Sequence, residues 1–73
     1  MKFSVSFFGD LKKLNAKVNL IDIKSIADIV SQIPELEAAP LNFIVARNGI
    51  NCDLNTEIEE NDDIRFYPMV MGG

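Results

Sequence analysis

The sequence closes with Ile-Arg-Phe-Tyr-Pro-Met-Val-Met-Gly-Gly at residues 64–73, a strand pattern that runs into a proline and then two glycines. Successive side chains of a strand point to opposite faces, so Ile64 and Phe66 share one face, which we predict to be buried. Pro68 has no amide hydrogen to donate to a neighbouring strand, and we expect regular pairing to end there. The residues after Pro68 are therefore predicted to leave the fold as a tail.

The tip of this tail is poor in side chains, because Gly72 precedes Gly73. Glycine has no Cβ and adopts conformations closed to other residues, so such a tip fits a channel too narrow for side chains. Residues 68–73 span about 20 Å when extended, at roughly 3.3–3.6 Å each. We expect Gly73 to carry a free α-carboxylate that a partner protein binds, in preference to an end that simply frays.

Side chains suited to a protein interface lie just before the glycines. Tyr67, Met69 and Met71 fall on the face of the last strand and tail opposite the core face. Aromatic and methionine side chains are favoured at interfaces, which predicts a docking surface there. Phe8 also breaks the alternation of the stretch before it, and it is either covered by local structure or offered to a partner.

The composition favours one folded domain, residues 1–73, with 48% hydrophobic residues and no apolar run as long as a membrane span. Seven basic and eleven acidic side chains give a net charge of −4, so we expect no nucleic-acid binding. One cysteine cannot form an internal disulfide, and the first residues lack a secretory signal. These features favour a cytoplasmic protein.

No catalytic or metal site is predicted within the chain itself. Histidine, the commonest general base and metal ligand, is absent. Asp53, Asn55 and Glu57 match three positions of a calcium-binding loop. Ile58 and Ile64, however, stand where that loop needs glycine and glutamate, so the interpretation fails.

The first twenty residues predict two strands joined by a helical turn. Residues 2–7 alternate polar and apolar side chains, the period of a half-buried strand, and Gly9 stops it. Residues 11–14 predict a single helical turn. Residues 17–20 resume the alternation and predict a second strand, antiparallel to the first because the connection is too short for a crossover helix.

A helix is predicted over residues 25–33. Ser25 and Asp28 have the spacing of a capping box at a helix start. Pro34 disfavours helical geometry at the preceding residue, so the helix should end there. The apolar side chains recur at helical spacing and predict the face that packs on the core: Ile26, Ile29, Val30 and Ile33.

A hairpin is predicted after a loop over residues 35–40. Residues 41–46 form a β-rich run, Asn-Gly at residues 48–49 is a strong turn signal, and residues 50–53 give a short return strand. Cys52 in that strand is predicted to be a structural side chain, since no histidine is present to activate its thiol. A solvated acidic connection then leads through a tight turn to the last strand.

The predicted order is strand, strand, helix, strand, strand, strand. Four motifs carry a resemblance to a known family. The Phe-Tyr-Pro-Met-Val-Met-Gly-Gly ending is similar to F-F-P-P-V-x-G-G, and Phe-Phe-Gly with Leu-Lys-Lys-Leu, within residues 7–14, is similar to that family's first strand and leucine/basic turn. Residues 45–49 resemble V-x-V-N-G, and residues 61–64 resemble D-G-D-x-V. The chain thus resembles the ubiquitin-like β-grasp sulfur carriers of the MoaD/ThiS family, closest to the small subunit of molybdopterin synthase (MoaD). The resemblance implies an α+β fold with a mixed sheet packed on one main helix and a protruding Gly-Gly tail.

The sequence departs from the molybdopterin pattern at three positions. Met69 replaces the second proline, Arg47 replaces an apolar residue, and Asp62 replaces the turn glycine. The thiamine-pathway sulfur carrier (ThiS) also ends in Gly-Gly but usually lacks the leucine/lysine turn and the proline before the tail. The molybdopterin branch is favoured on these grounds, and the thiamine branch stays an alternative.

The resemblance implies a chemistry centred on Gly73. An adenylating activating enzyme (MoeB/ThiF-like) uses ATP on its carboxylate, and a sulfur donor (cysteine desulfurase or rhodanese-like) converts it to a thiocarboxylate. The large molybdopterin synthase subunit (MoaE-like) then receives the sulfur for the dithiolene of molybdopterin. The chain itself is expected to bind no cofactor or metal, and not to be catalytic alone.

The resemblance also implies which residues meet these partners. Met71 and Gly72 are expected to line the inserted tail. The expected docking residues are Phe8, Tyr67, Pro68 and Met69. Two further classes stay open: a ubiquitin-like modifier joined to lysines of other proteins through Gly73, and a plain interaction module with an inert end.

Overall fold

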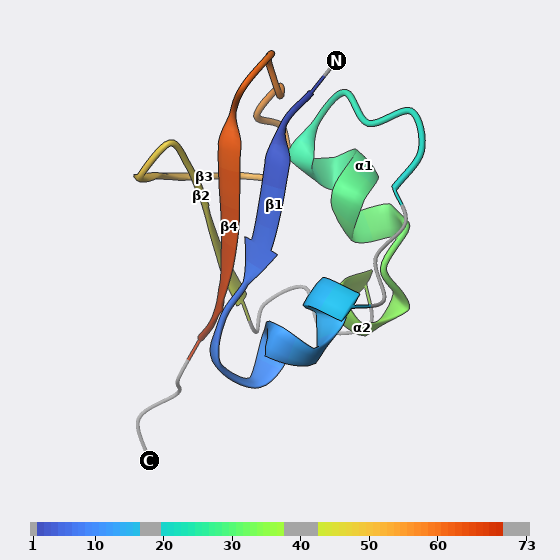
Figure 1. Ribbon diagram of the computed structural model, residues 1–73, viewed down its shortest axis with the longest axis vertical. Coiled ribbons are helices and arrows are strands. Elements are labelled where there is room, and N and C mark those ends of the chain that lie inside the picture. Colours follow the sequence, from blue (N-terminus) through green and yellow to red (C-terminus); the bar gives the residue numbers. More distant parts are fainter. Residues whose placement is uncertain (1, 17–19, 38–42, 70–73) are drawn as a thin grey trace.

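Four strands of the described residues pair into one mixed sheet, with short helices on one side of it (Figure 1). The structure is a computed structural model, and it describes residues 2–16, 20–37 and 43–69. The strands are β1 (Ser4–Phe7), β2 (Phe43–Arg47), β3 (Ile50–Cys52) and β4 (Asp63–Pro68). The helices are the 3₁₀ helix η1 (Gly9–Ala16), α1 (Ile26–Ser31) and α2 (Pro34–Glu37).

The sheet has the strand order β1-β4-β2-β3, so β4 lies between β1 and β2. β1 and β4 are parallel and run side by side in Figure 1, with Phe7 opposite Phe66. β2 is antiparallel to both β4 and β3. The sheet is therefore mixed, as the sequence predicts, and β4 pairs on both of its edges.

The core lies between the sheet and α1. The rings of Phe7 and Phe66 stack with their centroids 5.2 Å apart, and the tilted ring of Phe43 lies 5.5 Å from that of Phe66. The predicted apolar face of the helix is confirmed, because all four of its side chains are buried: Ile26, Ile29, Val30 and Ile33. Burial of such aliphatic and aromatic groups is the main stabilising term in a domain of this size.

The helical region is divided differently from the prediction. At its start the Asp28 carboxylate accepts from the Ser25 amide at 3.1 Å, as the capping box requires. α1 ends at Ser31, and Pro34 begins α2 where the sequence predicted a loop. Proline is disfavoured after a helical residue but is well suited to the first turn of a helix, so two residues, Gln32 and Ile33, separate the two helices. No helix in the described ranges is long and apolar enough to cross a membrane.

The strand predicted over residues 17–20 lies outside the described residues except for Leu20, which is in no strand. The single helical turn predicted at residues 11–14 is part of the longer helix η1, in which Leu14 is buried. The predicted strand over residues 41–46 is shifted: its first two residues are not described, and β2 continues to Arg47. The N-terminal strand and the return strand are confirmed in β1 and β3.

The hairpin between β2 and β3 turns at the predicted dipeptide. Asn48 has φ 54° and Gly49 has φ 85°, the left-handed conformation that both central residues of such a turn need. The register places Arg47 opposite Ile50, directly across the turn. The prediction of an Asn-Gly hairpin is confirmed.

The acidic connection before β4 is exposed over most of its length, as the sequence predicts, but the turn that closes it holds a buried carboxylate. Asp62 is buried, and its carboxylate accepts from the Nε of Arg47, from the Glu59 amide at 2.7 Å and from the Asn48 side chain at 3.0 Å. Arg47 also pairs with Glu59 at 3.1 Å. Two of the three departures from the family pattern, Arg47 and Asp62, are thus partners in one ion pair.

Candidate functional site

The site predicted from the sequence is approached along β4. The strand ends at Pro68, which lies opposite Phe43 of β2, so the predicted end of pairing is confirmed. Met69 follows it and is 39% exposed. This end of β4 lies beside η1 in Figure 1, at the opposite end of the strand from the Arg47–Asp62 ion pair.

Two aromatic rings stack where β4 ends. The rings of Phe8 and Tyr67 are 5.0 Å apart at an interplanar angle of 14°. The guanidinium carbon of Arg65 lies 5.7 Å from the centroid of Phe8, within the range of a cation–π contact. Phe8 is 37% exposed although it makes both contacts. Phe8 is therefore partly covered by its neighbours Tyr67 and Arg65, and the rest of its ring is accessible to a partner.

An isoleucine extends this aromatic pair across the sheet. Ile44 lies opposite Tyr67 in the β2–β4 register and is 37% exposed. Side chains opposite one another in a sheet share a face, so both lie on the face opposite the buried Phe66. We call this surface, made of Phe8, Ile44, Tyr67 and Met69 together with Pro68 at its edge, where the proline ring packs on Gly9, the exit surface.

The exit surface contains all four predicted docking residues and one that the sequence analysis missed. Ile44 was assigned to a strand without a face. The alternation that places Phe43 and Val45 in the core also places Ile44 outside it, so the signal was present. Contiguous exposed apolar side chains of this kind mark interaction sites on small proteins.

The other predicted site residues, Met71, Gly72 and Gly73, lie outside the described residues. The structure therefore describes the surface around Pro68 and Met69, the last described residues before the predicted tail. Pro68 is held there by close packing: an added Cβ on Gly9 would lie 2.6 Å from the Cγ of Pro68.

No family model matches the sequence, and no curated protein matches it significantly. Among solved structures, the crystal structure of SAMP1 from Haloferax volcanii is similar, with a TM-score of 0.66 over 97% of this chain and 98% of that one. The chain has the ubiquitin-like β-grasp fold. At 19% identity this likeness is evidence of fold, so the predicted fold class is confirmed while the molybdopterin branch stays a prediction.

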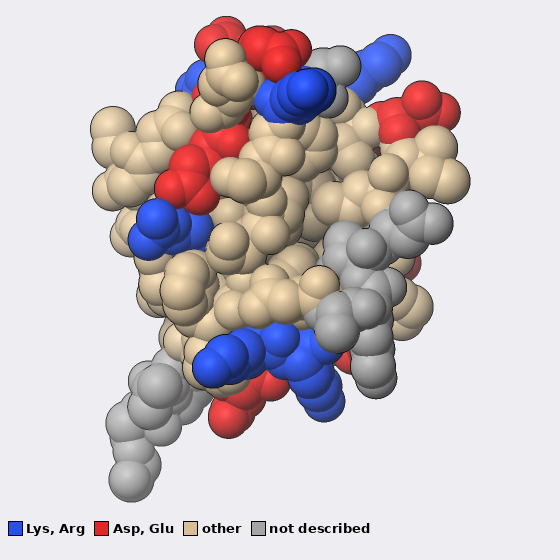
Figure 2. All heavy atoms as spheres, in the orientation of Figure 1, with Lys and Arg blue, Asp and Glu red and all other residues tan. Residues whose placement is uncertain are grey.

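Charged side chains lie on η1 and β4, the two elements that meet beside the exit surface of this β-grasp domain. Lys12 and Lys13 are exposed on η1, and Figure 2 shows basic side chains over that helix with acidic ones beside them. Arg65 forms a 3.0 Å ion pair with Asp63 on the same strand. Rim charges of this kind steer association more than they add affinity.

Cys52 is the strongest competing site in the β-grasp domain. It lies with Phe43 and Ile44 in the lining of a hollow of about 370 Å³. Burial raises the pKa of the Cys52 thiol, which keeps it in the weakly nucleophilic protonated form near neutral pH. The prediction that Cys52 is a structural side chain agrees with this environment.

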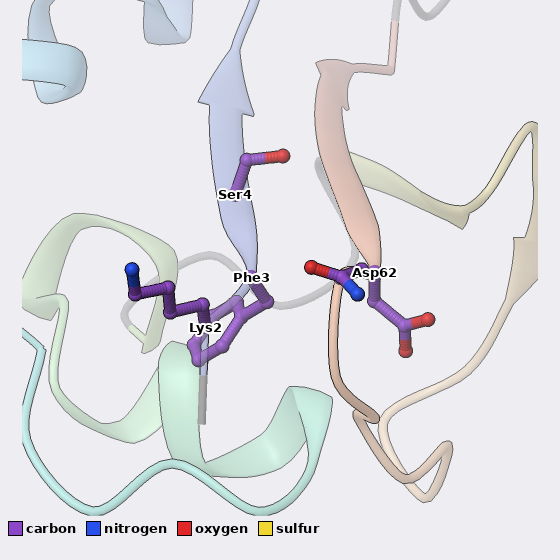
Figure 3. Close-up of a pocket in the computed structure, with 5 residues that line it drawn as sticks. Lys2, Phe3, Ser4 and Asp62 are labelled. Atoms are coloured by element: carbon purple, nitrogen blue, oxygen red, sulfur yellow. The ribbon is translucent and has the colours of Figure 1, made fainter.

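A second hollow, of about 220 Å³, lies where the chain enters β1 and β4 (Figure 3). Lys2, Phe3 and Ser4 line it, but the carboxylate of Asp62 points away from Lys2 and Phe3 toward its own partners. The negative charge of Asp62, which could otherwise attract a ligand to this hollow, is thus already paired with Arg47. Among the described residues, no group of three or more His, Cys, Asp and Glu side chains is placed to hold a metal ion.

Proposed function

We propose that this protein is a sulfur carrier, the small subunit of a two-component molybdopterin synthase. The observation that carries the proposal is the exit surface: an exposed aromatic and aliphatic patch at the root of a Gly-Gly tail, on a ubiquitin-like β-grasp domain. A domain whose carboxyl end reacts in the active sites of other enzymes needs a surface that those enzymes can bind. The exit surface is such a binding surface, and it lies next to Pro68, where strand pairing ends.

The chemistry takes place on the carboxylate of Gly73. It attacks ATP bound to a MoeB/ThiF-like activating enzyme, and pyrophosphate leaves as the acyl-adenylate forms. The persulfide of a cysteine desulfurase or rhodanese-like donor then displaces AMP and forms an acyl disulfide. A second thiol, acting as the two-electron reductant, cleaves the S–S bond, which releases the thiocarboxylate and leaves a disulfide on the donor. Sulfur is a softer and stronger nucleophile than the oxygen it replaces, by the logic that makes thiolates reactive.

The loaded tail is then used inside a MoaE-like large subunit. Docking through Phe8 and Tyr67 makes the transfer of sulfur to the pterin effectively intramolecular, which is worth several orders of magnitude in rate when the geometry is right. Met71 and Gly72 line the inserted segment, and the charged catalytic groups belong to the partner. This chain supplies the thiocarboxylate sulfur at Gly73 and the surface through which the large subunit recognises it.

Two alternatives use the same activation step. A thiamine-pathway carrier hands its sulfur to a different acceptor. A protein modifier joins Gly73 to a lysine of another protein. The three functions differ in what the activated chain reacts with: a pterin, a thiamine precursor or a lysine side chain.

The test uses the full chain with an untagged carboxyl end. With ATP, a MoeB/ThiF-like enzyme and sulfide, we expect intact mass to show replacement of one oxygen by sulfur at Gly73. The loaded protein mixed with a MoaE-like subunit and cyclic pterin phosphate is then expected to yield molybdopterin. Deletion of Gly73 is expected to abolish both signals while the melting temperature stays unchanged.

Each other outcome points elsewhere. Product formed by the chain lacking Gly73 overturns the role of the tail in chemistry. A loaded chain that gives no molybdopterin but sulfurates a thiazole-forming partner indicates the thiamine branch. Higher-mass conjugates through lysine, in place of free thiocarboxylate, indicate a modifier.

A further inference from the structure

Gly9 sits at the corner where β1 passes into η1, and it touches the far end of the chain. Its φ is 58°, and a Cβ built on it would lie 2.6 Å from the Cγ and 3.0 Å from the Cδ of Pro68. Real Cβ atoms essentially never approach another heavy atom as closely as the first of these distances. The backbone of the corner therefore packs directly on the ring of the last residue of β4.

Backbone conformation alone does not explain why this residue is glycine. The same chain places Asn48 at φ 54°, Asn61 at φ 68° and Asp22 at φ 55°. Asparagine and aspartate tolerate this left-handed region, so a φ of 58° does not by itself demand glycine. The close approach of Pro68 does, because any side chain at position 9 displaces the proline ring or the corner.

The corner is held firmly enough to act on Pro68. The Phe8 amide donates to the Phe66 carbonyl at 3.0 Å, which ties the corner to β4 one residue beyond the end of β1. The side-chain amide of Asn15 donates to the Phe7 carbonyl and accepts from the Phe7 amide, both at 2.9 Å. With the Phe8–Tyr67 stack, these contacts fix Gly9 relative to η1 and to β4.

We propose that Gly9 is a positioning residue that sets the direction of the chain at Pro68 and Met69, where β4 ends beside the exit surface. Its contact with Pro68 orients the bond to Met69, the last described residue before the predicted tail. In terms of the proposed sulfur-carrier function, on which this inference rests, docking and tail insertion into the activating enzyme are aligned before binding. Pre-organisation of this kind improves affinity by removing ordering costs.

The first test is Gly9→Asn, with Gly49→Asn as its matched control. Both glycines have positive φ, but an added Cβ on Gly49 meets nothing within 4 Å. We expect Gly9→Asn to change the residual dipolar couplings of the Met69 amide and to abolish the nuclear Overhauser contact between the Gly9 α-proton and the Pro68 ring. Gly49→Asn is expected to leave both unchanged. Equal effects of the two variants on Met69 would overturn the proposal.

The second test is adenylation of the full chain by the activating enzyme. We expect Gly9→Asn to raise the KM for the carrier about tenfold with kcat within about twofold, since the tail still reaches the site once it is aligned. A loss caused only by partial unfolding appears instead as a lower active fraction, which reduces the apparent kcat. The Gly49→Asn control is expected to keep the wild-type KM.

A double-mutant cycle separates the contact from other effects of the new side chain. Pro68→Ala removes the ring atoms that the added Cβ meets, so in that background Gly9→Asn is expected to have no further effect on KM. Additive effects of the two substitutions contradict the contact. If wild-type protein is not adenylated at all, the proposed function fails, and the couplings of Met69 still decide the role of Gly9.

Discussion

Strand β4 begins and ends in opposite kinds of environment. At its start, the Asp62 carboxylate is buried and satisfied by Arg47, Asn48 and the Glu59 amide. At its end, Tyr67 lies in an apolar patch that is open to solvent. One end has its polar groups paired within the chain, and the other leaves apolar groups without a buried environment. We infer that the first end stabilises the fold and the second is reserved for binding.

The electrostatics of the first end follow from its contacts. The pKa of the Asp62 carboxyl is lowered from 3.8 to about 2, first of all by the hydrogen bond from the Arg47 guanidinium. The Glu59 amide and the Asn48 side chain contribute to the same lowering, against an opposing effect of burial. A carboxylate held by several donors in this way favours its charged form in the folded state.

The largest expected effect is at the binding end. Replacing Phe8 and Tyr67 together with alanine is expected to weaken binding to a MoeB/ThiF-like activating enzyme by about 30-fold or more, the range of a central aromatic hot spot. Titration calorimetry measures the Kd. The matched control is Ile50→Ala, which removes a side chain that is 73% exposed but lies outside the exit surface. Equal losses in the two proteins would mean that the exit surface is not the docking site.

A stability effect without a binding effect is expected at the other end. Asp62→Asn removes the charge that Arg47 faces and is expected to lower the melting temperature by about 5 °C or more, measured by calorimetry. Asp63→Asn is the control, because its ion pair with Arg65 is exposed and such pairs contribute little. The Kd for the activating enzyme is expected to stay unchanged in Asp62→Asn. A loss of affinity as large as that of the aromatic variant would erase the distinction between the two ends.

The pH dependence of stability gives a smaller and more specific signature. Because the folded state lowers the pKa of Asp62, the unfolded state binds more protons between the two pKa values. The contribution of Asp62 is therefore fully present above pH 3.8 and is lost as the pH falls toward about 2. Denaturation by urea across this range is expected to show a shallower decline for Asp62→Asn than for the wild type. Parallel pH profiles would contradict the assignment.

The smallest effect is expected from the charge beside the exit surface. Arg65→Gln removes the guanidinium over Phe8. We expect the association rate with the activating enzyme to fall by roughly two- to threefold at low salt and to be unchanged at high salt. Stopped-flow measurements at two ionic strengths check this. A change confined to the dissociation rate would instead mean that Arg65 is buried in the complex.

Elements with a local pattern could be predicted from the sequence. The helix face with Ile26 and Ile29, the Asn48–Gly49 turn and the end of β4 at Pro68 each depend on residues within one turn or strand. Their signals are periodicity and backbone preference, which a reader of the sequence can see directly. The predicted loop over residues 35–40 was wrong in part because proline both ends one helix and begins another.

Contacts between distant segments could not be predicted in this way. Arg47 and Asp62 each resembled an isolated departure from a family motif, and only the fold shows that one compensates the other. At Gly9 the sequence predicts only the end of a strand, since nothing local indicates that Pro68 packs on it. Such pairs depend on strand order, and local periodicity carries no information about strand order.

The parallel pairing of β1 with β4 has a consequence for biosynthesis. Phe7 has no partner at its register position until Phe66 has been made, so the middle of the sheet closes only after the chain has been synthesised through β4. Incomplete chains lack the strand that joins the two halves of the sheet and remain substrates for proteases. Every chain that completes the sheet therefore already contains Pro68, the residue from which the predicted tail starts.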